Sequence, residues 1–161
     1  MSPLARIRRG EDARDVTLYG VHFRFRVDGD DSGGSLAVVE VEIPPKTLVK
    51  PHEHSREDEY TVVLSGSIGL RLGDEHSTLG PGTSLVKPRG VPHALWNASD
   101  EPATILEILS PAGFERYFEE VAPVLRLKGD TAAFYGLAER YGVRIVDDWI
   151  PELEAAYGVK L

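Results

Sequence analysis

Short runs of alternating apolar and polar residues dominate the first two thirds of the chain. Residues 16–27 place two phenylalanines on one side and two arginines on the other, which predicts a strand suited to a sheet edge. Residues 36–43 form a second β-rich run that ends at a pair of prolines. Six further strands are predicted, at residues 59–66, 67–75, 77–82, 83–88, 93–99 and 103–110. Because glycine or proline recurs every eight to twelve residues or so, the pattern predicts an all-β sandwich or barrel.

The pattern changes after Ser110-Pro111, where apolar residues recur at helical spacing. This part predicts two or three short helices, which we expect to pack on the barrel because short isolated helices are marginal in water. The predicted organisation is an N-terminal arm at residues 1–15, a barrel at 16–111 and a helical tail at 112–161. We expect the tail to cover one outer sheet. The alternative is a cap over the barrel mouth, suggested by the crowding of Phe134, Tyr135, Tyr141 and Trp149.

Composition narrows the possible partners and chemistry. A chain of 161 residues is about one domain, and its net charge of −8 repels polyanions, so we expect a small-molecule substrate and no nucleic acid. No apolar run approaches the roughly 18 residues of a membrane span, so we expect no membrane partner and a cytoplasmic location. The chain has no cysteine, so any metal ion must be held by histidine and carboxylate side chains.

Four side chains in two dense clusters form a candidate metal site. His52 and His54 are two residues apart in the segment KPHEHSREDEY, so in an extended chain both imidazoles point the same way. Glu59 opens the next predicted strand, and His93 opens a later one. Three imidazoles and one carboxylate suit one divalent ion of iron, manganese, nickel, copper or zinc, with positions left open for a substrate. We expect His22 and His76 to be surface or hydrogen-bonded core residues rather than ligands, and Glu57 and Asp58 to be solvated loop residues.

These clusters resemble the two sequence motifs of the cupin superfamily. The first motif, G-x5-H-x-H-x4-E-x6-G, is matched by the two clustered histidines, Glu59 and Gly66, with Lys46 in place of the opening glycine. The second, G-x5-P-x-G-x2-H-x3-N, is matched at Gly82, Pro88, Gly90, His93 and Asn97. We expect positive φ at the turn glycines. The resemblance implies the cupin double-stranded β-helix, a jelly-roll barrel, with the metal ion inside.

Strand parity predicts which other residues surround the site. Thr61, Val63, Leu95 and Asn97 share parity with the ligands, so we expect them to line a mostly apolar substrate pocket. Asn97 also faces inward in a position to support its strand by hydrogen bonding. Tyr60 and Trp96 have the opposite parity, and we expect Trp96 to pack against the helical tail or a partner subunit.

The resemblance supports three hypotheses about function. The first is an oxygen-dependent dioxygenase acting on an enolic or aromatic small molecule, with Glu59 as a ligand or catalytic base. Residues 108–120 are also similar to the segment that follows the barrel in small quercetin dioxygenase-like proteins. The second is a redox-neutral isomerase, cyclase or lyase that uses the same ligands. The third is a non-catalytic small-molecule-binding cupin. The resemblance and the edge strand at residues 16–27 also predict a homodimer.

Overall fold

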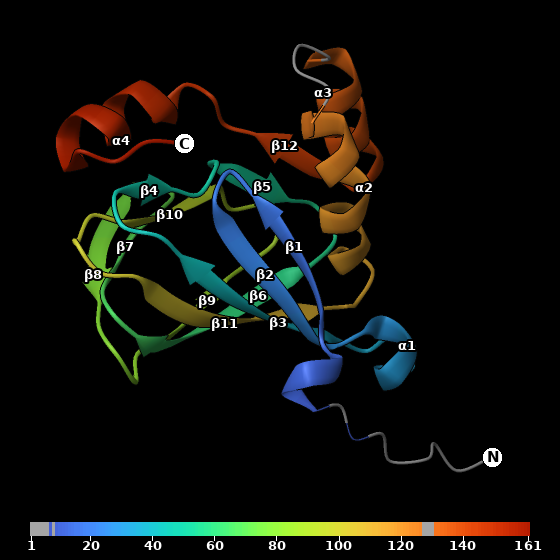
Figure 1. Cartoon of the computed structure of the whole chain (residues 1–161). Helices are drawn as coiled ribbons and strands as arrows, with labels where there is room; N and C mark the ends of the chain where they lie inside the picture. The colour runs from blue at the N-terminus through green and yellow to red at the C-terminus, as the bar shows by residue number, and fades with distance from the viewer. Residues whose placement is uncertain (1–6, 8, 127–130) are drawn as a thin grey trace.

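Two β-sheets form the body of the molecule, and the C-terminal helices lie against its outside (Figure 1). This computed structural model describes residues 7, 9–126 and 131–161. Residues 1–6 and 8 of the predicted N-terminal arm lie outside the described residues. The all-β architecture with short C-terminal helices that the sequence predicted is confirmed.

The first sheet has the strand order β1-β2-β3-β11-β6-β9, and every neighbouring pair is antiparallel. Its strands are β1 (Arg14–Leu18), β2 (Val21–Val27), β3 (Ala37–Ile43), β11 (Ala103–Ser110), β6 (Asp58–Ser65) and β9 (Ser84–Lys87). Burial alternates strictly along β3 and β11 because one face of the sheet points into the barrel and the other points outward.

The second sheet has the order β12-β5-β10-β7-β8, and the short strand β4 also pairs with β10. Its strands are β4 (Thr47–Leu48), β5 (His52–His54), β7 (Ile68–Leu72), β8 (Glu75–Leu79), β10 (His93–Asn97) and β12 (Val143–Ile145). All five residues of β10 are buried, because this strand lies between the barrel interior and the C-terminal segments.

The prediction of one strand over residues 16–27 is wrong, because a hairpin divides this segment into β1 and β2. Tyr19 and Gly20 form the turn, with φ of 50° and 83°. Positive φ at both central residues belongs to the tight turns that join antiparallel strands. Tyrosine is unusual at the first of these positions, so the sequence carried a weak turn signal. β1 lies at the edge of its sheet, and the homodimer expected from an edge strand stays a prediction.

Lys46 occupies the place of the missing motif glycine in the left-handed conformation that glycine would adopt, with φ of 56°. Its Nζ donates a hydrogen bond to the carbonyl oxygen of Ala98 at 2.6 Å and pairs with Asp100. The turn shape is therefore retained despite the substitution. The expected positive φ is confirmed at Gly66 and Gly82, at 76° and 85°.

The helices are short, and most follow the barrel in sequence. They are the 3-10 helix η1 (Gly10–Asp12), α1 (Gly29–Ser32), α2 (Glu115–Arg126), α3 (Thr131–Arg140) and α4 (Trp149–Tyr157). Trp96 packs against Tyr157 of α4, with ring centroids 4.3 Å apart and the rings tilted by 31°, which confirms its expected packing against the tail. Within the described residues, every helix is too short or too polar to cross a bilayer.

Candidate metal centre

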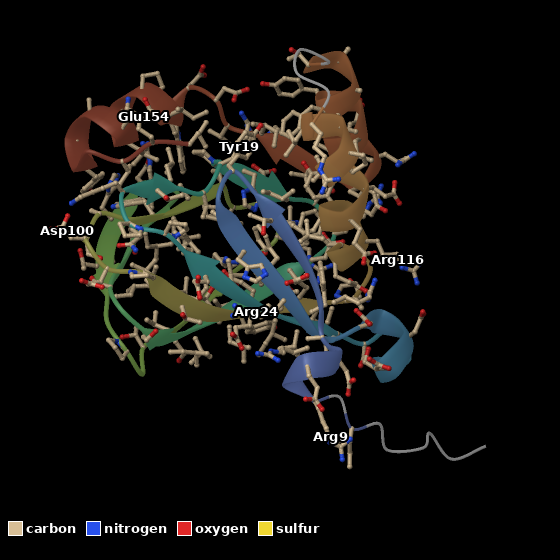
Figure 2. The ribbon with its side chains drawn as sticks, viewed as in Figure 1. Arg9, Tyr19, Arg24, Asp100, Arg116 and Glu154 are labelled. Atoms are coloured by element: carbon tan, nitrogen blue, oxygen red, sulfur yellow. The ribbon has the colours of Figure 1, made fainter. Side chains whose placement is uncertain are left out.

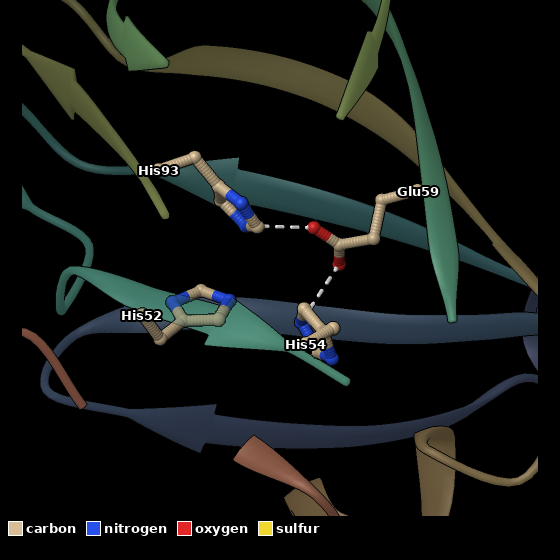
Figure 3. A group of neighbouring side chains, drawn as sticks. All are labelled: His52, His54, Glu59 and His93. Carbon is tan, nitrogen blue, oxygen red and sulfur yellow. Dashed lines mark ion pairs between the residues drawn. The ribbon is translucent and has the colours of Figure 1, made fainter. Parts of the chain in front are cut away.

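The four predicted ligands converge between the two sheets. His52 and His54 lie on β5 and His93 lies on β10, opposite His52 in the strand pairing, whereas Glu59 reaches across from β6 of the other sheet. One ligand atom from each of the four side chains lies within 4.8 Å of all the others. Figure 3 shows the four side chains pointing toward one another. Strand parity and the closure of the barrel therefore bring together four residues that span 41 positions of sequence (52 to 93).

Each imidazole is oriented by a partner on its Nδ1 atom. His52 Nδ1 is 2.6 Å from the carbonyl oxygen of Lys50, and His93 Nδ1 is 3.2 Å from that of Val91. A carbonyl oxygen can only accept, so both Nδ1 atoms carry the proton. His54 Nδ1 is 3.3 Å from Glu57 Oε2, an acceptor when ionised. This tautomer leaves the Nε2 lone pairs free, which is the usual arrangement of metal-binding histidines.

The buried polar atoms at the centre fit a bound cation. Within the described residues, the buried side-chain atoms without a hydrogen-bond partner are His54 Nε2, Glu59 Oε2 and His93 Nε2, although Glu59 Oε2 also forms an ion pair with Lys87. Glu59 Oε2 lies 2.9 Å from His93 Nε2, and Glu59 Oε1 lies 3.5 Å from His54 Nε2. Ligand atoms about 2.0–2.2 Å from one ion are separated by about 3 to 4.4 Å. The cluster is therefore close to the dimensions of a divalent metal site.

The surroundings of His52, His93 and Glu59 favour the protonation states that a metal ion requires. Burial lowers the pKa of His52 well below its usual value, and the neighbouring imidazoles lower it further. Burial also lowers the pKa of His93. Burial by itself raises the pKa of Glu59, but the charges of Lys87 and His54 outweigh it and hold this pKa well below its usual range. Burial therefore favours the neutral forms of His52 and His93, and the neighbouring charges favour the ionised form of Glu59.

A cluster of buried polar side chains that was not predicted from the sequence lies beside the ligands. Lys87 Nζ on β9 is 2.9 Å from Glu59 Oε2 and donates a 2.9 Å hydrogen bond to Glu107 Oε1 on β11. Thr61 Oγ1 donates to the other oxygen of Glu107 at 2.7 Å. Burial raises the pKa of Glu107 to about 7, although the charge of Lys87 acts in the opposite direction. A sequence signal existed, because Glu107 is in phase with the buried Ile105 and Leu109.

Two residues that we expected to be solvated have structural partners. Glu57 is 5% exposed and contacts His54, so the expectation of a solvated loop residue is wrong for it. Asp58 is half-buried and forms an ion pair with Arg89, with the shorter approach at 2.8 Å. The hydrogen bonds from Arg89 lower the pKa of Asp58 to about 2. Neither carboxylate belongs to the candidate ligand group.

The remaining histidines lie apart from this centre. His22 on β2 is 2.7 Å from Asp15 on β1, and His76 on β8 contacts the hydroxyl of Tyr157 at 2.9 Å. His22 and His76, which we did not expect to be ligands, are therefore not part of the candidate ligand group.

An apolar cavity of about 120 Å³ adjoins the metal centre. Its charged and polar lining residues are Lys50, His52, Glu59, Lys87, His93 and Glu107, and the other lining residues are aliphatic or aromatic. Tyr19, which Figure 2 shows at the tip of the β1–β2 hairpin, also lines it. The cavity is smaller than the ~300–1,000 Å³ of most ligand pockets, so it suits a small substrate.

The helical tail supplies a large part of the cavity wall, so the expectation that it only covers an outer sheet is wrong. Its contributions are Phe114, Tyr117, Phe118, Val121, Leu125, Phe134, Val143 and Ile145. The ring of Phe114 lies edge-on to His54 with centroids 4.3 Å apart. β12 pairs directly with β5, placing Val143 opposite His54 and Ile145 opposite His52. The tail therefore contacts the strand that carries two of the ligands.

The four predicted pocket residues occupy different places. Leu95 lines the cavity, whereas Thr61, Val63 and Asn97 are buried but are not among its lining residues. Asn97 Nδ2 donates to the carbonyl oxygens of Ile43 and Glu101, at 3.0 and 2.8 Å. Its Oδ1 accepts from the backbone and side chain of Ser99. Asn97 therefore supports its strand by hydrogen bonding, as its inward parity predicted.

Comparison with curated proteins finds distant relatives that are longer than the matched region. Germin-like protein 3-1 of Oryza sativa subsp. japonica is 30% identical over 105 residues, covering 59% of this chain and 47% of that protein. H2HPP isomerase of Bacillus subtilis is 25% identical over 109 residues, covering 67% of this chain and 44% of that protein. The chain thus spans less than half the length of these relatives.

Comparison with solved structures finds the same barrel. The polyketide cyclase RemF from Streptomyces resistomycificus has a TM-score of 0.59 and 25% identity, covering 66% of this chain and 80% of that one. An RmlC-like cupin from Shewanella frigidimarina has a TM-score of 0.60 and 17% identity, covering 70% of this chain and 96% of that one. At 17% identity, the second likeness shows the fold alone.

A family model described as "Cupin domain" matches residues 39–109, the segment that contains both histidine clusters. The sheet topology, the neighbouring structures and this match agree on the double-stranded β-helix predicted from the motifs. Residues 39–109 therefore match the cupin family, and the chain has the cupin fold.

Proposed function

We propose that the protein is a metal-dependent enzyme that rearranges a small enolisable compound without net oxidation, as an isomerase or cyclase does. One observation carries this proposal: of the four candidate ligands, His52, Glu59 and His93 line an apolar cavity whose wall also holds Lys87 and Glu107. The site thus combines candidate metal ligands with acid–base groups, all facing the same small space.

His52, His54, Glu59 and His93 would hold the metal ion. When bound, a divalent ion supplies Lewis acidity that stabilises negative charge on a substrate oxygen, such as that of an enolate. His52 and His93 contribute neutral nitrogen donors because their Nδ1 atoms carry the protons. The low pKa of Glu59 suits it to a ligand role better than to the role of catalytic base considered from the sequence.

Glu107 is the carboxyl group that we assign to proton transfer. It lines the cavity, and its pKa of about 7 lets it both accept and return a proton near neutral pH. Isomerisation of an enolisable compound needs these two steps: a proton leaves one carbon of the substrate and a proton is added at another. The apolar cavity walls exclude water from the intermediate stage.

The relatives support the redox-neutral reaction over the dioxygenase reaction. H2HPP isomerase and the polyketide cyclase RemF, each 25% identical to this chain, have names that denote rearrangements within a substrate. Oxygen chemistry could use the same four ligands, so the dioxygenase stays a prediction.

The first test measures the metal itself. The protein is purified without added metal and examined by elemental analysis, and we expect about one equivalent of a divalent transition metal. A His52→Ala and His54→Ala double variant should lose it, whereas a His22→Ala and His76→Ala double variant, matched in number of histidines removed, should keep it. Equal metal content in both variants would refute the assignment of the site.

The second test separates the two reactions. Metal-loaded protein is screened against enolic and 2-oxo compounds under strict anaerobiosis, and in parallel in an oxygen electrode. We expect substrate rearrangement without oxygen and no oxygen uptake above that of the His52→Ala and His54→Ala variant. Turnover that requires oxygen and consumes it stoichiometrically would replace this proposal with the dioxygenase.

A further inference from the structure

The inner face of α2 forms one wall of the cavity. Its lining residues recur at helical spacing, and they are Tyr117, Phe118, Val121 and Leu125. Phe118 stacks on Phe23 of β2 with ring centroids 4.4 Å apart, so this face of the helix is packed onto the barrel. Tyr117 is the member of this set that carries a polar group. One hydroxyl is therefore placed on an otherwise hydrocarbon wall.

The hydroxyl of Tyr117 has no hydrogen-bond partner among the residues that the structure describes. Tyr117 is 8% exposed, so bulk water has little access to it. The hydroxyl is not one of the fully enclosed polar atoms, so it borders open space, and the space that Tyr117 lines is the cavity. Buried tyrosine hydroxyls usually have a partner. A molecule in the cavity can supply the one that the protein does not.

The other tyrosines do not share this combination of burial and an unused hydroxyl. Three of them form hydrogen bonds through the hydroxyl, namely Tyr135, Tyr141 and Tyr157. Tyr19 and Tyr60 are 54% and 39% exposed, so water can serve their hydroxyls. Tyr117 is therefore distinct among the six tyrosines of the chain.

The Tyr117 hydroxyl is available as a hydrogen-bond donor. Burial raises the pKa of Tyr117, and the nearby Tyr19 raises it further, so the phenol keeps its proton at neutral pH. Phe114 and Phe118, which pack against its ring at centroid distances of 5.1 and 6.1 Å, carry no side-chain acceptor. A neutral oxygen on a bound molecule suits this wall, because an ion would lie unpaired against hydrocarbon.

Tyr117 lies one aromatic ring away from the metal centre. The ring of Phe114 is 4.3 Å from that of His54 and 5.1 Å from that of Tyr117, so the ring centres of His54 and Tyr117 are at most 9.4 Å apart, the sum of the two distances. The cavity volume is about 120 Å³. A cavity of about 150 Å³ is large enough to hold benzene. A molecule of this size that binds at the metal centre therefore extends toward the wall that carries Tyr117.

We propose that the Tyr117 hydroxyl binds substrate, by donating a hydrogen bond to a neutral oxygen at the end of the molecule that lies away from the metal centre. The substrate is then a compact molecule with a metal-binding oxygen at one end, a hydrocarbon body, and a carbonyl, ether or hydroxyl oxygen at the other end. This inference deepens the proposed function and rests on it, because the metal centre holds the first end. Tyr117 lies outside residues 39–109, so this selectivity belongs to the helical tail rather than to the segment that matches the cupin family.

The test uses pairs of ligands that differ only at the far end. Both members of a pair carry a hydroxamate, which binds zinc, and the other end is either a ketone or the methyl-branched hydrocarbon of the same shape. The pairs are 4-oxopentanohydroxamate with 4-methylpentanohydroxamate, and 5-oxohexanohydroxamate with 5-methylhexanohydroxamate. Zinc-loaded protein is titrated calorimetrically with each compound. The readout is the ratio of the two dissociation constants within a pair, because the shared contact with zinc cancels in it.

Tyr117→Phe keeps the ring and its packing but removes the hydroxyl. The ketone oxygen is then buried without a donor, which corresponds to about 5-fold or more in affinity. We therefore expect the affinity of the ketone relative to its hydrocarbon partner to fall by about 5-fold or more in at least one pair. The matched control is Tyr141→Phe, because the Tyr141 hydroxyl bonds to Glu120 at 2.5 Å and Tyr141 does not line the cavity. Its ratios should stay within about twofold of the wild type.

Three results would overturn the inference. The first is an unchanged ratio for both pairs in Tyr117→Phe. The second is an equal fall in Tyr141→Phe, which would show an effect of packing rather than of the cavity hydroxyl. The third is a fall in Lys50→Met in place of Tyr117→Phe, which would assign the oxygen to the lysine that lines the cavity and pairs with Asp147.

Zinc content, measured in every sample, keeps this inference distinct from the proposed function. Binding of zinc and of the hydroxamates with unchanged ratios overturns the role of Tyr117 and leaves the proposed function intact. Failure of the wild-type protein to bind zinc overturns both, because the substrate then lacks the metal centre that holds its first end.

Discussion

Replacing Asn97 by aspartate tests whether this residue supports the barrel or contacts substrate. The side chain is fully buried, and a backbone N–H of Ser99 bonds to its Oδ1, which identifies the amide orientation because an N–H can only donate. Asn97→Asp retains that acceptor but replaces the Nδ2 donor, which serves Ile43 and Glu101, with a second oxygen. Two carbonyl oxygens then lose their donor and face a carboxylate.

The expected cost follows from these two hydrogen bonds. Leaving a buried polar group unsatisfied costs about 1–3 kcal/mol, so for two groups we expect a loss of about 2–6 kcal/mol in the free energy of unfolding, out of ~5–15 kcal/mol for a domain. Urea denaturation followed by tryptophan fluorescence measures it as a lower midpoint at unchanged slope. Ser77→Asp on the exposed strand β8 adds the same charge and should cost less than about 1 kcal/mol.

Two results would refute this reasoning. A loss below about 0.5 kcal/mol in Asn97→Asp would show that the two donor bonds contribute nothing net. Loss of bound metal or of ligand affinity in fully folded Asn97→Asp protein would show that the residue acts on the site, although it does not line the cavity.

Three further predictions address the site and the packing around it. Glu57→Ala removes the partner of His54 Nδ1 and should weaken zinc affinity by about 10-fold or more in a chelator competition; unchanged affinity would contradict this support. Gly69→Ala should lower the free energy of unfolding, measured in urea, by about 1–3 kcal/mol or more, because a Cβ at this position would lie 2.0 Å from the Trp96 ring. A change of less than about 0.5 kcal/mol, as for a neutral surface substitution, would contradict this clash. Burial raises the pKa of Glu107 to about 7, so the contribution of this group to the stability of the metal-free protein should be fully present below pH ~4.5 and be lost as the pH rises through ~7. Glu107→Gln should remove this loss of stability. An equal dependence of stability on pH in the variant and the wild type would refute the prediction.

Much of the barrel and the ligand group could be predicted from the chain because their signals are local. His52 and His54 share a face at a spacing of two, and Gly66 and Gly82 mark turns that require positive φ. Alternation of apolar and polar residues identifies each strand and its inward face, because a sheet with one buried face imposes a period of two. The hairpin at Tyr19 was not predicted, because the local sequence signal for a turn is weak there.

Only the tertiary structure decided what surrounds the ligands. Lys87 and Glu107 are 20 residues apart in the sequence, and their contact depends on the strand order β11-β6-β9. The alternation of apolar and polar residues does not determine this order. The pairing of β12 with β5 places Val143 opposite His54, 89 positions earlier in the sequence. Because of this pairing, the helical tail forms part of the cavity wall rather than only covering an outer sheet. Local patterns determine which face of a strand is buried, whereas long-range packing determines which buried faces meet.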